Sequence, residues 1–192
     1  MFYRFAQVLV FIYFKIFFRL RVIGRGNVPK TGGVILCANH GSMMDPVILS
    51  KATPRQVHYI SKKELFKNGL IALVLRGLGA FPVDRGGTDM AAYKKTVDLL
   101  KQNRVVGVFA QGSRYKEVDA RDAKAGVALF ALKSGAEVIP VAIKTNYKLF
   151  TKMTLNIGKP VDLTEYRDKR IKTETLAEIT DIIFNEIAGL MK

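Results

Sequence analysis

Short apolar runs, each ending in a polar loop, alternate along the chain with longer amphipathic stretches. The runs predict β-strands at 34–38, 57–61, 105–109, 138–143 and 153–157. The longer stretches predict helices at 42–51, 63–78, 88–102, 123–134 and 173–191, with Ser42, Thr88 and Thr173 as their N-caps where a cap is visible. Strands that alternate with helices favour an α/β domain, in which a mostly parallel or mixed sheet is flanked by helices. Functional residues are then expected in loops at the strand ends.

The composition is that of a single globular domain. The chain has 192 residues, of which 49% are hydrophobic, and it shows no repeat and no linker. Its one cysteine, Cys37, excludes an internal disulfide and has the apolar neighbours of a buried strand residue. The only histidines are His40 and His58, so a zinc site of the usual Cys/His kind is disfavoured. We expect neither a metal nor a cofactor.

The first 22 residues form an apolar and aromatic segment that also carries basic side chains. Its charge-free part, 5–14, would be about 15 Å long as a helix, roughly half the thickness of a bilayer core. Arg4, Lys15 and Arg19 fall within one arc of a helical wheel, which favours a helix lying in the membrane interface. We therefore predict a membrane-associating helix at 1–22 and a globular domain at 23–192. A tilted span is the alternative, and the absence of a small-x-small pattern disfavours a cleaved signal peptide.

The chain carries 31 Lys and Arg against 16 Asp and Glu, a formal net charge of +15. Such an excess is typical of proteins that bind nucleic acid, an anionic membrane surface or acidic soluble ligands. No nucleic-acid-binding module is recognisable, and nucleic acid would leave the N-terminal segment unexplained. We therefore expect anionic membrane lipid as a partner, no nucleic acid, and monotopic association with the cytoplasmic face of a membrane.

The sequence NHGSMMDP follows the predicted strand at 34–38 and contains a candidate general base. His40 and Asp45 are five positions apart, so a continuous helix would not place them on one face. A tight turn at Gly41 and Ser42 could fold Asp45 back under His40. A carboxylate in that place would fix the tautomer of the imidazole and stabilise its protonated form. Asn39, which stops the strand, belongs to the same motif.

Two further polar loops carry arginines. Arg85 lies in the glycine-flanked phrase FPVDRG, where a guanidinium could grip a phosphate with two hydrogen bonds. Gln111, Gly112, Ser113 and Arg114 directly follow the predicted strand at 105–109. Taken alone, either loop is better interpreted as an ordinary polar surface loop.

Taken together and in this order, these segments resemble the motifs of the glycerolipid acyltransferase family, which includes the 1-acyl-sn-glycerol-3-phosphate acyltransferases. The family's first motif, Asn-His-x4-Asp, is matched by Asn39, His40 and Asp45. Its second motif ends in a phosphate-gripping arginine, which is matched by Arg85. The resemblance extends from about residue 22 to the C-terminus.

The third and fourth motifs are matched with substitutions. The third reads FAQGSR against the usual Phe-Pro-Glu-Gly-Thr-Arg, so Ala110 replaces a proline and Ser113 keeps a hydroxyl. Gln111 is the larger departure, because it removes an anionic acceptor while keeping one carbonyl oxygen. The fourth motif, Val-Pro-Val, is matched by IPV around Pro140, which must lie at a sheet edge or a strand end because proline lacks an N–H.

The resemblance implies transfer of a fatty acyl group from acyl-CoA or acyl carrier protein to the free hydroxyl of 1-acylglycerol-3-phosphate, giving phosphatidic acid. It implies His40 as the general base, Asp45 as its support, and Arg85 with the loop 111–114 as the binding site for the acceptor. Ser42 is expected to cap a helix rather than to act as a nucleophile.

Two alternatives stay open. Gln111 keeps another acceptor possible, such as glycerol-3-phosphate or a different lyso-lipid. The other alternative is a catalytically inactive, basic peripheral membrane protein that binds lipid, against which the intact pair of His40 and Asp45 argues.

Overall fold

The strands form a single sheet with one antiparallel junction. The computed structural model describes residues 16–83, 90–110, 126–167 and 170–192, together with Tyr3, Phe5, Val8, Ile12 and Tyr13. Among these residues the sheet has seven strands in the order β1-β7-β6-β2-β5-β3-β4. They are β1 (Leu20–Ile23), β2 (Val34–Ala38), β3 (Val57–Lys62), β4 (Ala80–Val83), β5 (Val105–Phe109), β6 (Glu137–Lys144) and β7 (Met153–Ile157). All neighbours are parallel except β6 and β7. The predicted single-domain α/β fold is therefore confirmed.

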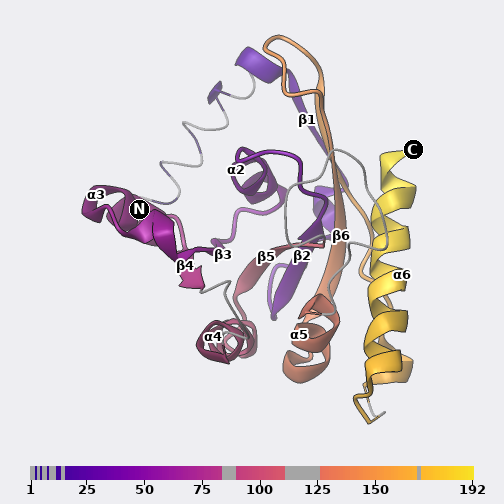
Figure 1. Cartoon of the computed structure of the whole chain (residues 1–192). Helices are drawn as coiled ribbons and strands as arrows, with labels where there is room; N and C mark the ends of the chain where they lie inside the picture. Colours follow the sequence, from indigo (N-terminus) through magenta and orange to yellow (C-terminus); the bar gives the residue numbers. More distant parts are fainter. Residues whose placement is uncertain are drawn as a thin grey trace.

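Helices cover both faces of the sheet. In the described part of the chain they are α2 (Asp45–Leu49), α3 (Gly69–Gly77), α4 (Met90–Lys101), α5 (Gly126–Ser134) and α6 (Thr173–Met191). Short 3-10 turns lie at Arg25–Asn27, Ser50–Ala52, Lys63–Phe66 and Thr164–Tyr166. Figure 1 shows α6 running along one face of the sheet, while α2 lies on the other.

Two hydrophobic cores result, one on each face of the central strands. On the α2 side, Leu36 of β2 is packed in one buried cluster with Ile48 of α2 and Leu155 of β7. On the other side, Cys37 of β2 belongs to a cluster with residues of α4, α5 and α6, such as Ile183. All five residues of β2 are buried because both of its faces are covered.

The β1–β7 end of the sheet is covered less completely. In β7 the buried residues Met153, Leu155 and Ile157 alternate with the partly exposed Thr154 and Asn156. The buried set faces the core on the α2 side. The opposite face of β7 is only partly covered, and there Asn156 Nδ2 donates to the Leu190 carbonyl of α6.

Two predicted helices begin later than the sequence suggested. The helix predicted at 42–51 starts at Asp45, because the Ser42 hydroxyl accepts from Met44 N within a local turn and Pro46 occupies the first turn of the helix. Ser42 is therefore not its N-cap. The helix predicted at 63–78 is divided into a 3-10 turn and α3, which Asn68 caps by accepting from the N–H groups of Leu70 and Ile71.

The other predicted caps have different outcomes. Helix α6 begins at Thr173 as expected, but its N-cap position is Lys172. Thr88 lies outside the described residues.

The N-terminal segment is helical at each of its described residues up to Phe18, and a strand follows. Residues 20–22 were predicted as the last turn of a helix at 1–22, but they belong to β1, which pairs with β7. Pairing with β7 satisfies backbone groups that a longer helix would have used internally, so the helical segment ends before Arg19, whose φ is 41°. None of the helices formed by the described residues has the length and apolar character needed to cross a membrane.

Pro140 does not lie at a sheet edge. It sits within β6, between β2 and β7, and is paired with Cys37 in the parallel ladder. The Pro140 carbonyl accepts from Gly158 N at 2.8 Å, so this residue turns its hydrogen-bonding side towards β7, just beyond the last pair of that ladder, Val141 and Ile157. The missing N–H is tolerated because the antiparallel ladder has already ended there.

Candidate active site

The site lies where β2 ends, and Asn39 holds this end in place. The Asn39 side chain is buried and bridges to β6 with two hydrogen bonds: its Nδ2 donates to the Ile143 carbonyl at 3.1 Å, and its Oδ1 accepts from Ile143 N at 2.7 Å. These bonds continue the contact between β2 and β6 beyond the ladder, which ends at Ala38 and Val141. Asn39 thus fixes the point at which the chain turns away from the sheet to present His40.

His40 and Asp45 are brought together as predicted. His40 Nδ1 lies 2.9 Å from Asp45 Oδ2, and the same oxygen accepts from the N–H groups of Gly41 at 2.7 Å and Ser42 at 2.8 Å. The turn at Gly41 and Ser42 therefore wraps around the carboxylate at the start of α2. Because Asp45 accepts at this oxygen, the proton of a neutral His40 resides on Nδ1, and Nε2 keeps its lone pair for accepting a proton.

Asp45 is fully buried, and both of its oxygens are hydrogen-bonded. Its second oxygen, Oδ1, accepts from the hydroxyl of Tyr147 at 2.7 Å. A buried carboxylate is stable only when such donors replace its hydration. Tyr147 is 102 positions away from Asp45 in the sequence, so the set of donors is complete only in the folded chain.

Tyr147 was not identified from the sequence. It follows β6 in the loop that leads to β7, and it adopts a left-handed backbone conformation with φ 57°. Burial and the hydrogen bond to Asp45 both raise the pKa of the Tyr147 phenol well above its ordinary value. The hydroxyl therefore remains a donor over the whole range in which an imidazole titrates. No local pattern could have pointed to it, because its partner is 102 positions away.

Gly41 allows this close approach. A Cβ atom at position 41 would lie 2.9 Å from the Tyr147 hydroxyl oxygen and 3.3 Å from the ring carbon Cε2. The absence of a side chain at Gly41 thus leaves the space that Tyr147 occupies beside Asp45.

The His40 ring is supported from one side by Phe109, at the end of β5. The two rings are stacked, with their centroids 4.0 Å apart and an interplanar angle of 18°. The His40 side chain keeps 16% of its surface exposed, and among the described residues its Nε2 has no hydrogen-bond partner. The ring is therefore oriented on two sides while one nitrogen stays open to a substrate.

Ser42 is not arranged as a nucleophile beside this base. Its hydroxyl accepts from Met44 N at 3.2 Å, and it makes no hydrogen bond with His40. A serine nucleophile requires the base within hydrogen-bonding distance of its hydroxyl.

Comparison with known proteins decides the family. The family model described as Acyltransferase matches residues 19–144, which include His40, Asp45 and the strands around them. The chain belongs to the Acyltransferase family. The resemblance seen in the four sequence motifs is thereby confirmed.

Several curated relatives of this acyltransferase carry one description. The 1-acyl-sn-glycerol-3-phosphate acyltransferase of Bacillus subtilis (strain 168) is 32% identical over 89% of this chain and 87% of its own length. The protein of the same description from Streptococcus pneumoniae is 31% identical over 81% of this chain, which spans 60% of that protein. The crystal structure of the 1-acyl-sn-glycerophosphate (LPA) acyltransferase PlsC from Thermotoga maritima has a TM-score of 0.73 with 24% identity and covers 97% of this chain and 77% of its own. The last likeness supports the fold.

The remaining motif residues of the acyltransferase fall outside the described part of the chain. These are Arg85, Gln111, Gly112, Ser113 and Arg114. Ala110, which directly precedes Gln111, donates from its N–H to the Ala38 carbonyl at 3.0 Å. The point at which the third motif begins is therefore adjacent to the end of β2 that carries His40.

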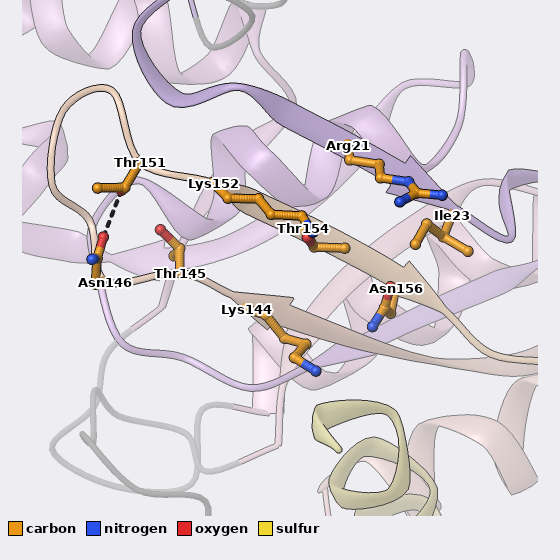
Figure 2. Close-up of a pocket in the computed structure, with 9 residues that line it drawn as sticks. All are labelled: Arg21, Ile23, Lys144, Thr145, Asn146, Thr151, Lys152, Thr154 and Asn156. Carbon is orange, nitrogen blue, oxygen red and sulfur yellow. Dashed lines mark hydrogen bonds between the residues drawn. The ribbon is translucent and has the colours of Figure 1, made fainter.

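A separate hollow of about 530 Å³ lies beside the partly exposed side chains of β1 and β7 and the last residue of β6, Lys144. Figure 2 shows that Arg21, Lys144 and Lys152 line it together with threonine and asparagine side chains. His40 and Asp45 are not among its lining residues, so this basic hollow is distinct from the candidate active site.

The other candidates for chemistry have structural surroundings. Cys37 is completely buried in β2, and desolvation raises the pKa of its thiol to about 12. His58 Nδ1 lies 3.2 Å from the Gly79 carbonyl, and burial lowers the pKa of this imidazole. Within the described ranges, no three His, Cys, Asp or Glu side chains are grouped so that they could hold a metal ion.

Proposed function

We propose that this acyltransferase esterifies the free hydroxyl of 1-acylglycerol-3-phosphate and forms phosphatidic acid, with His40 as the general base. The observation that carries this proposal is the 2.9 Å contact of His40 Nδ1 with buried Asp45, which leaves Nε2 open. The acceptor is inferred from the names of the Bacillus subtilis and Streptococcus pneumoniae relatives, both 1-acyl-sn-glycerol-3-phosphate acyltransferases. Neither acyl-CoA nor acyl carrier protein is favoured as donor by a described residue.

In the proposed reaction, the acceptor hydroxyl oxygen attacks the thioester carbonyl carbon while His40 Nε2 takes the hydroxyl proton. Asp45 stabilises the imidazolium that forms. Collapse of the tetrahedral intermediate breaks the carbon–sulfur bond, and the imidazolium returns its proton to the departing thiolate. The ester and the free thiol are the products, and no acyl-enzyme is required.

The charged tetrahedral oxygen needs donors that are not already occupied. The Gly41 and Ser42 N–H groups donate to Asp45, and Met44 N donates to Ser42 Oγ, so these three donors after His40 are already occupied. We therefore assign this role to backbone N–H groups around Gly112.

The acceptor phosphate would be bound by Arg85 and Arg114, with Gln111 and Ser113 contacting the glycerol portion. This assignment rests on the sequence motifs and on the position of Ala110 beside β2. Arg85→Ala should raise the KM for the acceptor far more than that for the acyl donor, whereas Arg170→Ala, an exposed arginine before α6, should change neither. Equal effects of Arg85→Ala on both KM values would contradict the assignment.

The chain is further proposed to act as a monotopic protein at the cytoplasmic face of a membrane, with residues 1–22 as the membrane-associating part and 23–192 as the catalytic part. The exposed apolar side chains of the N-terminal segment support this, including Phe5 at 64% and Ile16 at 58%. Anionic lipid would be a partner for the net charge of +15.

The decisive experiment measures acyl transfer to 1-acylglycerol-3-phosphate in detergent micelles, from acyl-CoA and from acyl-acyl carrier protein. We expect wild-type turnover with at least one donor and a loss of more than about a hundredfold in His40→Ala. His58→Gln is the matched control, since it changes the chain's other histidine away from Asp45, and it should keep its activity. Turnover that survives His40→Ala would exclude His40 as the base.

A second acceptor is favoured by one observation. The third motif reads FAQGSR, and Gln111 lacks the negative charge of the usual glutamate. Activity would be measured with 1-acylglycerol-3-phosphate, glycerol-3-phosphate and lyso-lipids with other headgroups. A higher kcat/KM for one of the other compounds would identify that compound, rather than 1-acylglycerol-3-phosphate, as the preferred acceptor.

A further inference from the structure

The loop between β6 and β7, residues 145–152, exposes two large apolar side chains at its tip. Leu149 is 56% exposed and Phe150 is 62% exposed. Such adjacent exposed apolar side chains in a protein without a partner mark an interaction surface. Figure 1 shows this loop projecting beyond the sheet at the end where the helical N-terminal segment enters β1.

The loop is held in one conformation by its own polar residues. Asn146 Oδ1 accepts from Lys148 N at 3.1 Å and from the Thr151 hydroxyl at 2.6 Å, and Thr151 N donates to the Lys148 carbonyl at 3.3 Å. Figure 2 shows the bond between Thr151 and Asn146 across the base of the tip. The apolar pair is therefore presented by a closed turn.

The tip is continuous with the N-terminal segment. Phe150 N donates to the Phe17 carbonyl, and the two rings are in contact with centroids 5.9 Å apart. Phe17 in turn contacts Tyr13. Tyr13 and Ile16 are each about half exposed. The exposed apolar residues of the loop and of the segment thus form one surface.

Positive charge surrounds this apolar surface. The exposed Lys148 and Lys152 flank Leu149 and Phe150, and the nearby basic hollow adds Arg21 and Lys144. No Asp or Glu occurs in residues 145–152 or among the residues that line the hollow. Apolar side chains bordered by lysines match a membrane interface, where the chains enter the acyl boundary and the ammonium groups contact anionic headgroups.

We propose that the 145–152 loop is a second membrane-contacting element, whose Leu149 and Phe150 insert into an anionic lipid interface beside the N-terminal segment. The inference deepens the proposed function and rests on it for the presence of a lipid substrate. The same loop places Tyr147 on Asp45, so insertion would set the base at the level of the headgroups from which the acceptor comes. Charge and apolar exposure together favour a lipid surface over an acidic protein, which would need no apolar wedge.

The chain contains no tryptophan, so one introduced indole reports on a single position. Leu149→Trp would be compared with Met90→Trp, a substitution at an apolar residue of similar exposure at the start of α4. Both full-length variants are mixed with vesicles of phosphatidylcholine and phosphatidylglycerol in equal amounts. Emission at position 149 should shift to shorter wavelength and be quenched by brominated acyl chains, while emission at position 90 should do neither.

A charge variant tests the second half of the inference. Lys148→Gln with Lys152→Gln should weaken binding to these vesicles by about fivefold per lysine, and the effect should disappear at high salt. Lys101→Gln with Lys133→Gln, two exposed lysines on α4 and α5, is the matched control and should bind as the wild type does.

Several outcomes would overturn the inference. The first is that the protein sediments with vesicles while the emission at position 149 stays unchanged. The second is that the protein does not bind vesicles. The third is that acyl carrier protein alone shifts the emission. Insertion by a chain that transfers no acyl group would count against the proposed reaction and leave the membrane contact standing, so the two failures are distinguishable.

Discussion

The hydroxyl of Tyr147 donates a 2.7 Å hydrogen bond to Asp45, the residue that holds the His40 ring. His40 is therefore held by Asp45, which is five positions away in the sequence, and Asp45 is held by Tyr147, which is 102 positions away. Tyr147 touches no reacting atom, so its role is to position Asp45.

Tyr147→Phe should lower kcat/KM about tenfold with little change in either KM, because Asp45 Oδ1 loses its donor while the ring remains. The free energy of unfolding should fall by about 1–2 kcal/mol, since a buried acceptor is left unpaired. Steady-state kinetics and urea denaturation measure the two effects. An unchanged kcat/KM would exclude a positioning role.

The alkaline stability of the protein offers a separate test of this contact. Burial and the bond to Asp45 raise the pKa of Tyr147, so the folded state holds the phenolic proton more tightly than the unfolded chain, whose tyrosine pKa is near 10. This contribution is fully present below pH 10 and is lost as the pH rises further. Denaturation midpoints between pH 8 and 11 should therefore decline less steeply in Tyr147→Phe than in the wild type.

Gly41→Ala should impair the same support from the other side. The added Cβ would lie 2.9 Å from the Tyr147 hydroxyl, so Tyr147 must move away from Asp45. We expect a fall in kcat/KM of about tenfold. In the double variant with Tyr147→Phe the losses should be less than additive, because both changes disrupt one contact. Fully additive losses would show that position 41 acts by another route.

Asn39 should contribute to stability more than a partly exposed asparagine that makes a single hydrogen bond to the backbone. Asn39→Ala removes both hydrogen bonds to Ile143 and should cost about 2–3 kcal/mol. Asn156→Ala is the matched control, because the Asn156 side chain makes one such bond, to the Leu190 carbonyl, and should cost less. Chemical denaturation in micelles distinguishes them, and equal losses would contradict a special role for Asn39.

Ser42→Ala should retain substantial turnover. Its hydroxyl accepts from Met44 N in a local turn, so we expect a loss of stability of at most about 1 kcal/mol. Loss of all turnover in a variant of near wild-type stability would reinstate Ser42 as a participant in the chemistry.

Cys37 should be inert in the folded protein. Burial raises the pKa of the thiol to about 12, so at pH 8 it is protonated as well as inaccessible. A thiol-reactive dye should label the native protein slowly and the urea-unfolded protein rapidly. Rapid labelling of native protein would indicate that the β2 region opens on the time scale of the assay.

Much of this molecule could be predicted from local patterns. The predicted bounds are those of three strands, Val34–Ala38, Val105–Phe109 and Met153–Ile157. Their ends are visible in the sequence because each apolar run stops at Asn39 or at a polar loop. The pairing of His40 with Asp45 was also predictable, since a turn of a few residues suffices to make it. The roles of Arg85 and residues 111–114 remain predictions from the motifs.

What only the tertiary structure decided concerns partners that are distant along the chain. The end of the N-terminal helical segment was misplaced because β1 gains its hydrogen bonds from β7, more than a hundred positions later. Pro140 was assigned to a sheet edge or a strand end because the sequence does not reveal that the antiparallel ladder stops beside it. Tyr147 and Phe109 join His40 and Asp45 only when β5 and β6 align beside β2, since a hydrogen bond or a ring contact depends on distance in space, which periodicity along the chain does not encode.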